Sequence, residues 1–112
     1  MLIVDGYSSH VNLAFLEMCD KLRIIVHILP AHSTYKLQPL DVGLFSPLVT
    51  YYSNGLNKSL YSSVAIVSMT KDLFYSIFKD AFQKAFIESN IRSAFEKTGI
   101  FPICSEIILS TL

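Results

Sequence analysis

Two aspartates, Asp5 and Asp41, stand where carboxylates often take part in chemistry. Asp5 follows the apolar run 2–4, which predicts a short buried strand, and functional side chains of parallel α/β sheets gather where strands end. Asp41 follows a proline-containing segment, at the expected first turn of a helix. Two carboxylates on rigid element ends suit Mg²⁺ or Mn²⁺, which bind oxygen ligands and keep waters in their remaining positions. Spacing alone is better explained by a turn former at Asp5 and a helix cap at Asp41.

The elements that must position these aspartates begin with a strand, a helix and a second strand. Apolar residues at three- and four-residue spacing predict a helix over about residues 10–21, with Ser8 or Ser9 as its cap. A β-branched run predicts the second strand at 24–28, and a right-handed crossover would make the two strands parallel. Two strands cannot form a covered parallel sheet. The rest of the sheet is therefore expected upstream of Met1 or in another chain.

The second half of the chain favours helices. Residues 30–40 contain two prolines and predict an ordered loop, and residues 44–60 keep a helical period that Pro47 should kink and Asn54-Gly55 should weaken. Residues 62–69 fit either a strand or a buried loop.

Two further helices are expected after this segment. Thr70 should cap a helix whose wide apolar face carries several phenylalanines. A last short helix should start at Ser89 or Asn90 and end at Thr98-Gly99. The predicted fold class is α/β, with a βα core over about 1–60 and a helical tail over about 70–102.

Composition limits the function classes. The 112 residues suit one domain, and nine basic residues balance nine acidic ones, so no basic excess favours non-specific binding of nucleic acid. Cys19 and Cys104 lie in no metal-binding or redox spacing, which indicates reduced, buried thiols more than a disulfide. The longest apolar run, 24–31, is too short to span a membrane. These features predict a soluble intracellular protein without a membrane partner.

Three segments resemble a known family. They are VDGYSSH at 4–10, LPAHSTYKLQPLDVGLFSPL at 29–48 and AFQKAFIESNIRSAFEKTGIFP at 81–102. In order and spacing they resemble the pogo/Tigger branch of the mariner-like transposases, whose catalytic part is a DDE-superfamily endonuclease with a ribonuclease H-like fold. The middle segment is the most specific, because the family has a proline-rich loop that leads to Gln-Pro-Leu-Asp-x-Gly.

The resemblance implies roles for both aspartates. Asp5 matches the second catalytic aspartate of the family and Asp41 matches the third, and both would hold two Mg²⁺ or Mn²⁺ ions for phosphodiester cleavage of DNA. The family's first aspartate lies on an earlier strand, so this chain is expected to be the carboxy-terminal part of a ribonuclease H-like domain with an incomplete sheet. Alone it should bind metal weakly and cut no DNA. No small-molecule cofactor is implied.

Further residues, besides the two aspartates, are candidates for binding substrate. His10 resembles the family's turn histidine and would contact substrate or metal, or else only close the turn. His32, Ser33 and Thr34, on the loop before Gln38, are expected near the DNA backbone by resemblance, although a hydrogen-bond network within the loop explains them as well. Gln38 opens the Gln-Pro-Leu-Asp-x-Gly motif itself.

Other patterns favour structural roles. Asp5 with Ser8, Ser9 and His10 lacks the G-x-S-x-G turn of a hydrolase nucleophile. His27 lies inside an expected strand and should pack in the core. The phenylalanines of 74–101 should form the core of a helical layer and not a surface for stacking nucleotides.

Two function classes follow from these observations. The first is a fragment of a DDE-type transposase, nuclear and bound to DNA, that needs a missing upstream half or a second copy of itself. The second is a domesticated, non-enzymatic domain that binds protein or DNA through an exposed sheet edge or helical face.

Overall fold

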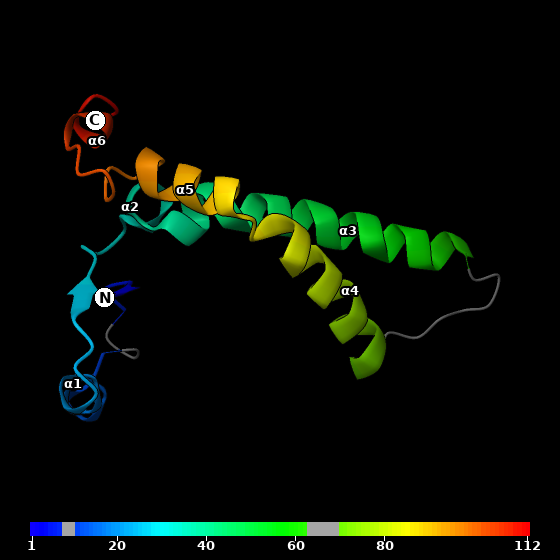
Figure 1. Ribbon diagram of the computed structural model, residues 1–112, viewed down its shortest axis with the longest axis horizontal. Helices are drawn as coiled ribbons and strands as arrows, with labels where there is room; N and C mark the ends of the chain where they lie inside the picture. The colour runs from blue at the N-terminus through cyan, green and yellow to red at the C-terminus, as the bar shows by residue number, and fades with distance from the viewer. Residues whose placement is uncertain (8–10, 63–69) are drawn as a thin grey trace.

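A computed structural model describes residues 1–7, 11–62 and 70–112 and shows a mixed α/β chain, mostly helical, with a two-stranded parallel sheet (Figure 1). The elements, in chain order, are β1 (Leu2–Val4), α1 (Leu13–Lys21), β2 (Val26–Ile28), α2 (Thr34–Leu37), the π-helix η1 (Leu40–Leu44), α3 (Phe45–Ser62), α4 (Lys71–Ala85), α5 (Glu88–Lys97) and α6 (Glu106–Leu109).

The strand, helix, strand order predicted for the first thirty residues is confirmed. β1 and β2 pair in parallel, with Leu2 opposite Val26 and Val4 opposite Ile28. The helix begins at Leu13, and its N-cap is Asn12, whose side chain accepts a hydrogen bond from the backbone N–H of Phe15 at 2.9 Å. The predicted caps Ser8 and Ser9 lie outside the described residues.

β2 is shorter than the predicted 24–28 because the end of α1 uses part of that segment. The backbone N–H of Ile24 donates to the carbonyl of Cys19 at 2.8 Å, and Arg23 adopts a left-handed conformation with φ of 55°. These two residues close the turn after the helix. Only then does the chain become extended, at Val26.

The segment 30–40, predicted as a loop, contains a helical turn. α2 begins after Ser33, and the backbone N–H of Gln38 closes it by donating to the carbonyl of Thr34 at 3.0 Å. The prolines at 30 and 39 lie on either side of the turn. Because neither lies within α2, both leave its hydrogen bonds intact.

α3 runs unbroken from Phe45 to Ser62, so the weakening expected at Asn54-Gly55 is not seen. The irregular turn lies before the helix, in η1. Pro47 is the third residue of α3 and follows the point where the backbone hydrogen bonds change from the π to the α pattern. Proline has no N–H, and at this position in the first turn of α3 it removes no α-helical hydrogen bond within that helix. Of the segment 62–69, only Ser62 lies among the described residues.

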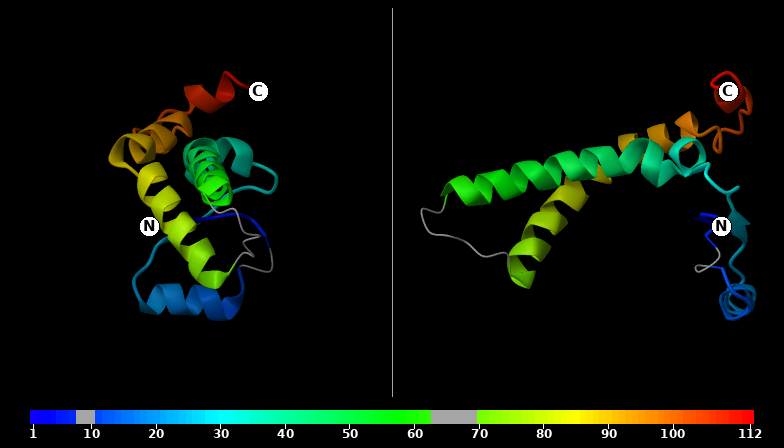
Figure 2. Two further views of the ribbon diagram at one scale, coloured as in Figure 1. Left: turned by 90° about the vertical axis from the view of Figure 1, so that its right-hand side faces the viewer. Right: turned by 180° about the vertical axis from the view of Figure 1, so that it is seen from behind.

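α4 turns back beside α3 (Figure 2) and packs on it through small residues. Its predicted cap is confirmed, because Thr70 Oγ1 accepts a hydrogen bond from the N–H of Leu73 at 3.1 Å. Ile77, Ala81 and Ala85 are buried. A Cβ at Gly55 of α3 would lie 3.0 Å from Ile77 Cγ2, so this glycine lets the two helices approach closely.

α5 packs on η1 in the same way. A Cβ at Gly43 would lie 2.7 Å from Ala94 Cβ and 2.9 Å from Ala94 Cα, and Ala94 is 0% exposed. The helix begins at Glu88, slightly earlier than predicted, after Ile87 as its N-cap. This contact fixes the η1 turn against the helical half of the chain.

The predicted glycine end of α5 is confirmed as a Schellman motif. Gly99 has φ of 70°, its N–H donates to the carbonyl of Glu96, and the N–H of Ile100 donates to the carbonyl of Phe95 at 3.2 Å. This helix is not the last, because α6 follows it. The Nζ of Lys36 donates to the carbonyl of Thr111 at 3.1 Å and so ties the C-terminal segment to α2.

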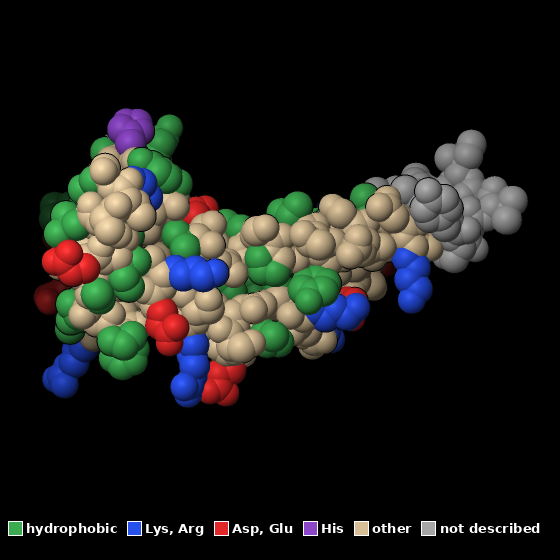
Figure 3. All heavy atoms as spheres, turned by 90° about the horizontal axis from the view of Figure 1, so that it is seen from above, with side chains coloured by type: hydrophobic (Ala, Val, Ile, Leu, Met, Phe, Trp, Pro, Cys, Tyr) green, Lys and Arg blue, Asp and Glu red, His purple; other side chains and the backbone are tan. Residues whose placement is uncertain are grey.

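The chain exposes more surface than a globular domain of its mass. Its accessible area is 8574 Å², whereas a folded monomer of this mass is expected to expose about 6,200 Å². Its radius of gyration is 17.9 Å, against about 13 Å for a compact domain of this length. Hydrophobic side chains gather on the surface at the end that carries the C-terminal segment (Figure 3).

Two predictions of burial are therefore wrong. His27 is exposed, because only one other strand pairs with β2 in the described part of the chain. The phenylalanine face of α4 is only partly covered, since Phe74 is 47% and Phe82 42% exposed, and Phe101 is 73% exposed. Phe82 and Phe86 stack with ring centroids 4.1 Å apart, so each of these two rings covers part of the other.

Candidate active site

Asp5 lies directly after β1, at the carboxyl end of the sheet. Its Oδ1 accepts a long hydrogen bond from the backbone N–H of Tyr7, at 3.4 Å. A Cβ at Gly6 would lie 2.8 Å from the carbonyl oxygen of Leu29, so only glycine lets the chain after Asp5 pass this close to the end of β2. The carboxylate is half-buried.

Asp41 lies in the π-helical turn η1 and is exposed. The turn is joined to α2 by the N–H of Val42, which donates to the carbonyl of Gln38 at 3.0 Å. The contact of Gly43 with Ala94 holds the other side of the turn. Single π turns are frequent at functional sites, because they redirect one side chain out of the regular helical pattern.

Both carboxylates line one groove, which we call the Asp5–Asp41 groove. Its volume is about 580 Å³. It is lined by Leu2, Val4, Asp5, Phe15, Thr34, Gln38, Leu40, Asp41 and Phe45. The two carboxylates, one amide and one hydroxyl therefore face a hollow whose other walls are apolar.

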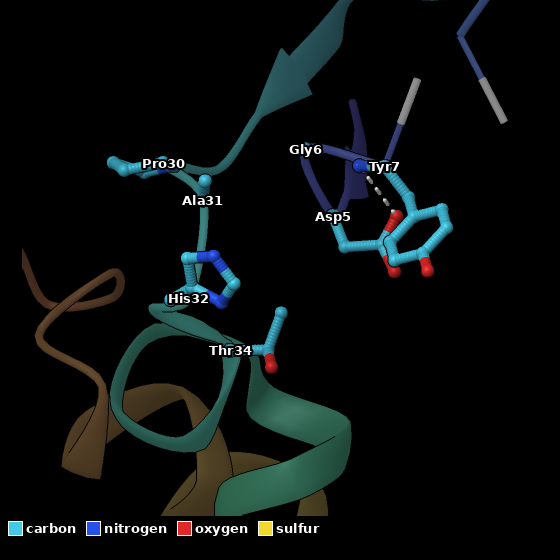
Figure 4. A pocket seen from close by; sticks show the side chains of 7 residues that line it. All are labelled: Asp5, Gly6, Tyr7, Pro30, Ala31, His32 and Thr34. Carbon is cyan, nitrogen blue, oxygen red and sulfur yellow. Dashed lines mark hydrogen bonds between the residues drawn. The ribbon is translucent and has the colours of Figure 1, made fainter. Parts of the chain in front are cut away.

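A second hollow opens beside the first, and we call it the Tyr7–His32 pocket (Figure 4). It has a volume of about 500 Å³. Its lining residues are Asp5, Gly6, Tyr7, Pro30, Ala31, His32 and Thr34. Asp5 and Thr34 belong to both hollows, so the two adjoin at these side chains.

The structure brings together some of the predicted site residues and not others. Gln38 lines the groove with Asp5 and Asp41, and His32 lines the adjoining pocket. Ser33 Oγ donates to the carbonyl of Pro30 at 2.6 Å, so its hydroxyl closes the loop. His10 lies outside the described residues.

Among the polar residues that line the two hollows, Tyr7 was not a predicted site residue. Tyr7 lies close in sequence to Asp5 and His10, but its type alone gave no signal of a site. Thr34, which was expected near the DNA backbone with His32 and Ser33, lines both hollows. Gly43 belongs to the Gln-Pro-Leu-Asp-x-Gly motif, and its role is the close approach of α5.

The oxygen atoms that line the Asp5–Asp41 groove supply part of what a hard divalent cation needs. Among residues 1–7, 11–62 and 70–112, no group of three or more His, Cys, Asp or Glu side chains is placed to hold a metal ion. The groove offers two carboxylates with amide and hydroxyl oxygens, and Mg²⁺ commonly binds one or two carboxylates and keeps several waters. The cysteines are both free thiols.

Comparison with known proteins identifies one family. Residues 1–95 match the family model described as DDE superfamily endonuclease. The chain is also 39% identical, over all of its 112 residues, to a protein of Cochliobolus lunatus named MFS-type transporter clz9. It spans 12% of the length of that curated relative. No solved structure matches the chain.

The name of that relative describes a transporter. In the described part of this chain, no helix is both long enough and apolar enough to cross a membrane. The 39% identity therefore concerns a segment that, in this chain, folds without such a helix.

Proposed function

The chain belongs to the DDE superfamily endonuclease family, and on this premise we propose that it is part of a transposase-type endonuclease that cleaves DNA with divalent metal ions. The 112 residues form one partial domain of ribonuclease H-like fold, from the pogo/Tigger branch. The protein acts in the nucleus, where its substrate is.

The observation that carries the proposal is the Asp5–Asp41 groove. Its two carboxylates come from segments far apart in sequence, one after a strand and one in a π-helical turn. A carboxylate that only formed a turn or capped a helix would not need to share a hollow with the other. The amide of Gln38 and the hydroxyl of Thr34 supply neutral hydrogen-bonding groups for the sugar and phosphate of a substrate.

Each of these residues has a definite task in such a reaction. Asp5 and Asp41 would hold Mg²⁺ or Mn²⁺, which when bound activates the attacking oxygen and stabilises the leaving oxygen. Leu2, Phe15 and Phe45 form apolar walls of the groove beside the two carboxylates. The Gly43–Ala94 contact positions Asp41 through η1 and so couples the groove to α5.

The two carboxylates do not by themselves balance two divalent cations. We propose that a third carboxylate comes from outside the described residues, on a strand that extends the sheet beside β1 or β2. The exposed apolar side chains around the sheet, among them Leu2 at 39% and Ile28 at 45%, support such an extension. A second copy of the chain is the other source of covering surface.

Metal binding and cleavage test the proposal separately. Mn²⁺ binding to the 112-residue chain should be weak, and Asp5→Asn or Asp41→Asn should each abolish it, while Asp20→Asn, an exposed aspartate of α1, should leave it unchanged. Supplying the upstream half of a related domain should give metal-dependent DNA cleavage that both groove variants lose. Equal Mn²⁺ binding by all three variants would exclude the groove as the metal site.

A non-enzymatic, domesticated domain is the second candidate. It is favoured by the exposed apolar surface of the βαβ unit, which suits contact with another protein. Reassembled halves that bind DNA and never cut it would support this candidate. So would a transcript that starts just before Met1.

A further inference from the structure

The Tyr7–His32 pocket is formed by the two segments that follow neighbouring parallel strands. Asp5, Gly6 and Tyr7 come from the end of β1, and Pro30, Ala31 and His32 come after β2 (Figure 4). The backbones approach closely only because residue 6 is glycine. The opening between them is therefore set by the pairing of β1 with β2.

The walls of this pocket carry two rings that can stack on a flat ligand. The Tyr7 side chain is 68% exposed, and the imidazole of His32 lies across the opening from it (Figure 4). His32 has φ of 57°, a conformation that costs free energy for a residue other than glycine and is often found at functional sites. Thr34 adds a hydroxyl between the two walls.

The size and polarity of the pocket suit a planar, polar heterocycle. Its volume of about 500 Å³ falls within the range of small-ligand sites, roughly 300–1,000 Å³. Aromatic planes combined with a few hydrogen-bonding groups are what unpaired nucleobases meet on proteins. A base inside a duplex cannot enter such a pocket, because its faces are covered by its neighbours.

Charge decides how a nucleotide would lie. Asp5 lines the pocket, so a phosphate would be repelled there unless a cation offset that carboxylate. The phosphate therefore belongs over the Asp5–Asp41 groove, where a divalent cation held by the two carboxylates would offset the repulsion, and the base belongs on the side of Tyr7 and His32. Because Asp5 and Thr34 are shared by both hollows, a single nucleotide can reach both.

We propose that the Tyr7–His32 pocket is a nucleobase subsite, which takes one unpaired base next to the phosphodiester held at the groove. This inference rests on the proposed function for the phosphate, but the base contacts stand without it. Tyr7 and His32 are substrate-binding residues in this scheme. They do not hold the metal.

Two fluorescent probes test the subsite. The first is a single-stranded oligonucleotide that contains 2-aminopurine, titrated with the 112-residue chain in Mn²⁺. The second is the free 2-aminopurine deoxynucleoside, which has no phosphate, titrated in chelator. Stacking quenches the fluorescence of both probes, so saturable quenching is expected in each titration.

The following variants remove each ring in turn while leaving the backbone conformation of its segment unchanged. Tyr7→Ala should weaken binding of both probes by about 5-fold or more, the effect of losing one base–aromatic stack, and Tyr7→Phe should restore it. His32→Gly removes the imidazole while allowing the positive φ, so it should also weaken both without disturbing the loop. Tyr75→Ala is the matched control, because Tyr75 is 61% exposed and lies on α4.

The outcomes distinguish this inference from the proposed function. Equal quenching by Tyr7→Ala, His32→Gly and Tyr75→Ala, in variants whose thermal unfolding matches the parent chain, overturns the subsite even where Mn²⁺ binds. Absence of any saturable quenching of either probe overturns it as well. Nucleoside binding that depends on Tyr7 and His32, in a chain that binds no Mn²⁺, supports the subsite and contradicts the metal site.

Discussion

The βαβ unit and the helical half of this chain hold together by different means. In the βαβ unit, backbone hydrogen bonds join β1 to β2, and many apolar side chains stay exposed, such as Leu13 at 71% and Ile25 at 73%. In the helical half, small residues let the helices approach closely, and Ala81, Ala85 and Ala94 are at most 1% exposed. The helical half thus has a closely packed seam of small residues, although the phenylalanine face of α4 stays partly exposed, whereas the βαβ unit offers its sheet surface to another strand or chain.

This difference matters for the groove, because each half supplies one aspartate. Asp5 depends on the paired strands, and Asp41 depends on η1 and its contact with α5. Loss of either half should therefore remove one side of the proposed metal site while leaving the other side folded. Matched substitutions in the βαβ unit and in the helical half test whether the two halves are stabilised independently.

The largest effect is expected from an isoleucine that is buried in the helical half. Ile77→Ala should lower the free energy of unfolding by about 2–4 kcal/mol, because it removes a side chain only 7% exposed and leaves a cavity between α3 and α4. Ile25→Ala, the same change at a site that is 73% exposed, should cost less than about 0.5 kcal/mol. Urea denaturation followed by circular dichroism measures both. Similar losses of unfolding free energy from Ile77→Ala and Ile25→Ala would contradict the difference in packing between the two halves.

A smaller effect separates two glycines. Gly43→Ala should cost about 1–3 kcal/mol, because its Cβ would meet the backbone and Cβ of Ala94 and push η1 away from α5. Gly55→Ala meets only the Cγ2 methyl of Ile77, at 3.0 Å, and no backbone, so a small shift of that side chain together with the gain in helix propensity should keep its cost below that of Gly43→Ala, at about 1 kcal/mol or less. Denaturant midpoints give both values.

The same glycine variant also tests the link to function. If η1 positions Asp41, Gly43→Ala should weaken Mn²⁺ binding and Gly55→Ala should not. Unchanged Mn²⁺ affinity in Gly43→Ala would show that the η1–α5 contact does not position this aspartate.

Helix caps in the two halves provide a third comparison. Asn12→Ala and Thr70→Ala each remove a side-chain acceptor at a helix start, and each should cost about 1 kcal/mol. Amide hydrogen exchange should show whether the losses stay local: Asn12→Ala should speed exchange in α1, and Thr70→Ala in α4. Equal acceleration throughout the chain by either variant would indicate one cooperative unit.

The smallest effect is expected at the surface ion pairs. Lys84 pairs with Asp80 at 2.9 Å and Arg92 with Glu88 at 2.8 Å, and all four side chains are more than half exposed. Removing either pair, by Asp80→Asn or Glu88→Gln, should cost no more than about 0.5 kcal/mol, and less in high salt. A loss above 1 kcal/mol would mean that these pairs do more than stabilise single helices.

Local patterns in the sequence predicted the elements that depend on near neighbours. The β1–α1–β2 order, the Thr70 cap and the glycine end of α5 are all found, because strand propensity, side-chain caps and a positive φ act over a few residues. The roles of Asp5 and Asp41 were inferred from resemblance. Both residues line one groove, and their roles as metal ligands stay a prediction.

The sequence by itself determined where helices and strands form and which two carboxylates stand at their ends. Only the tertiary structure decided what is covered. His27 and Phe74 have the side chains of core residues, yet they are exposed, because burial depends on a partner surface and not on residue type. The approach of Gly43 to Ala94 likewise joins distant segments, and no local pattern encodes a contact between two small side chains. That contact, together with the pairing of β1 and β2, is what brings Asp5 and Asp41 to one groove.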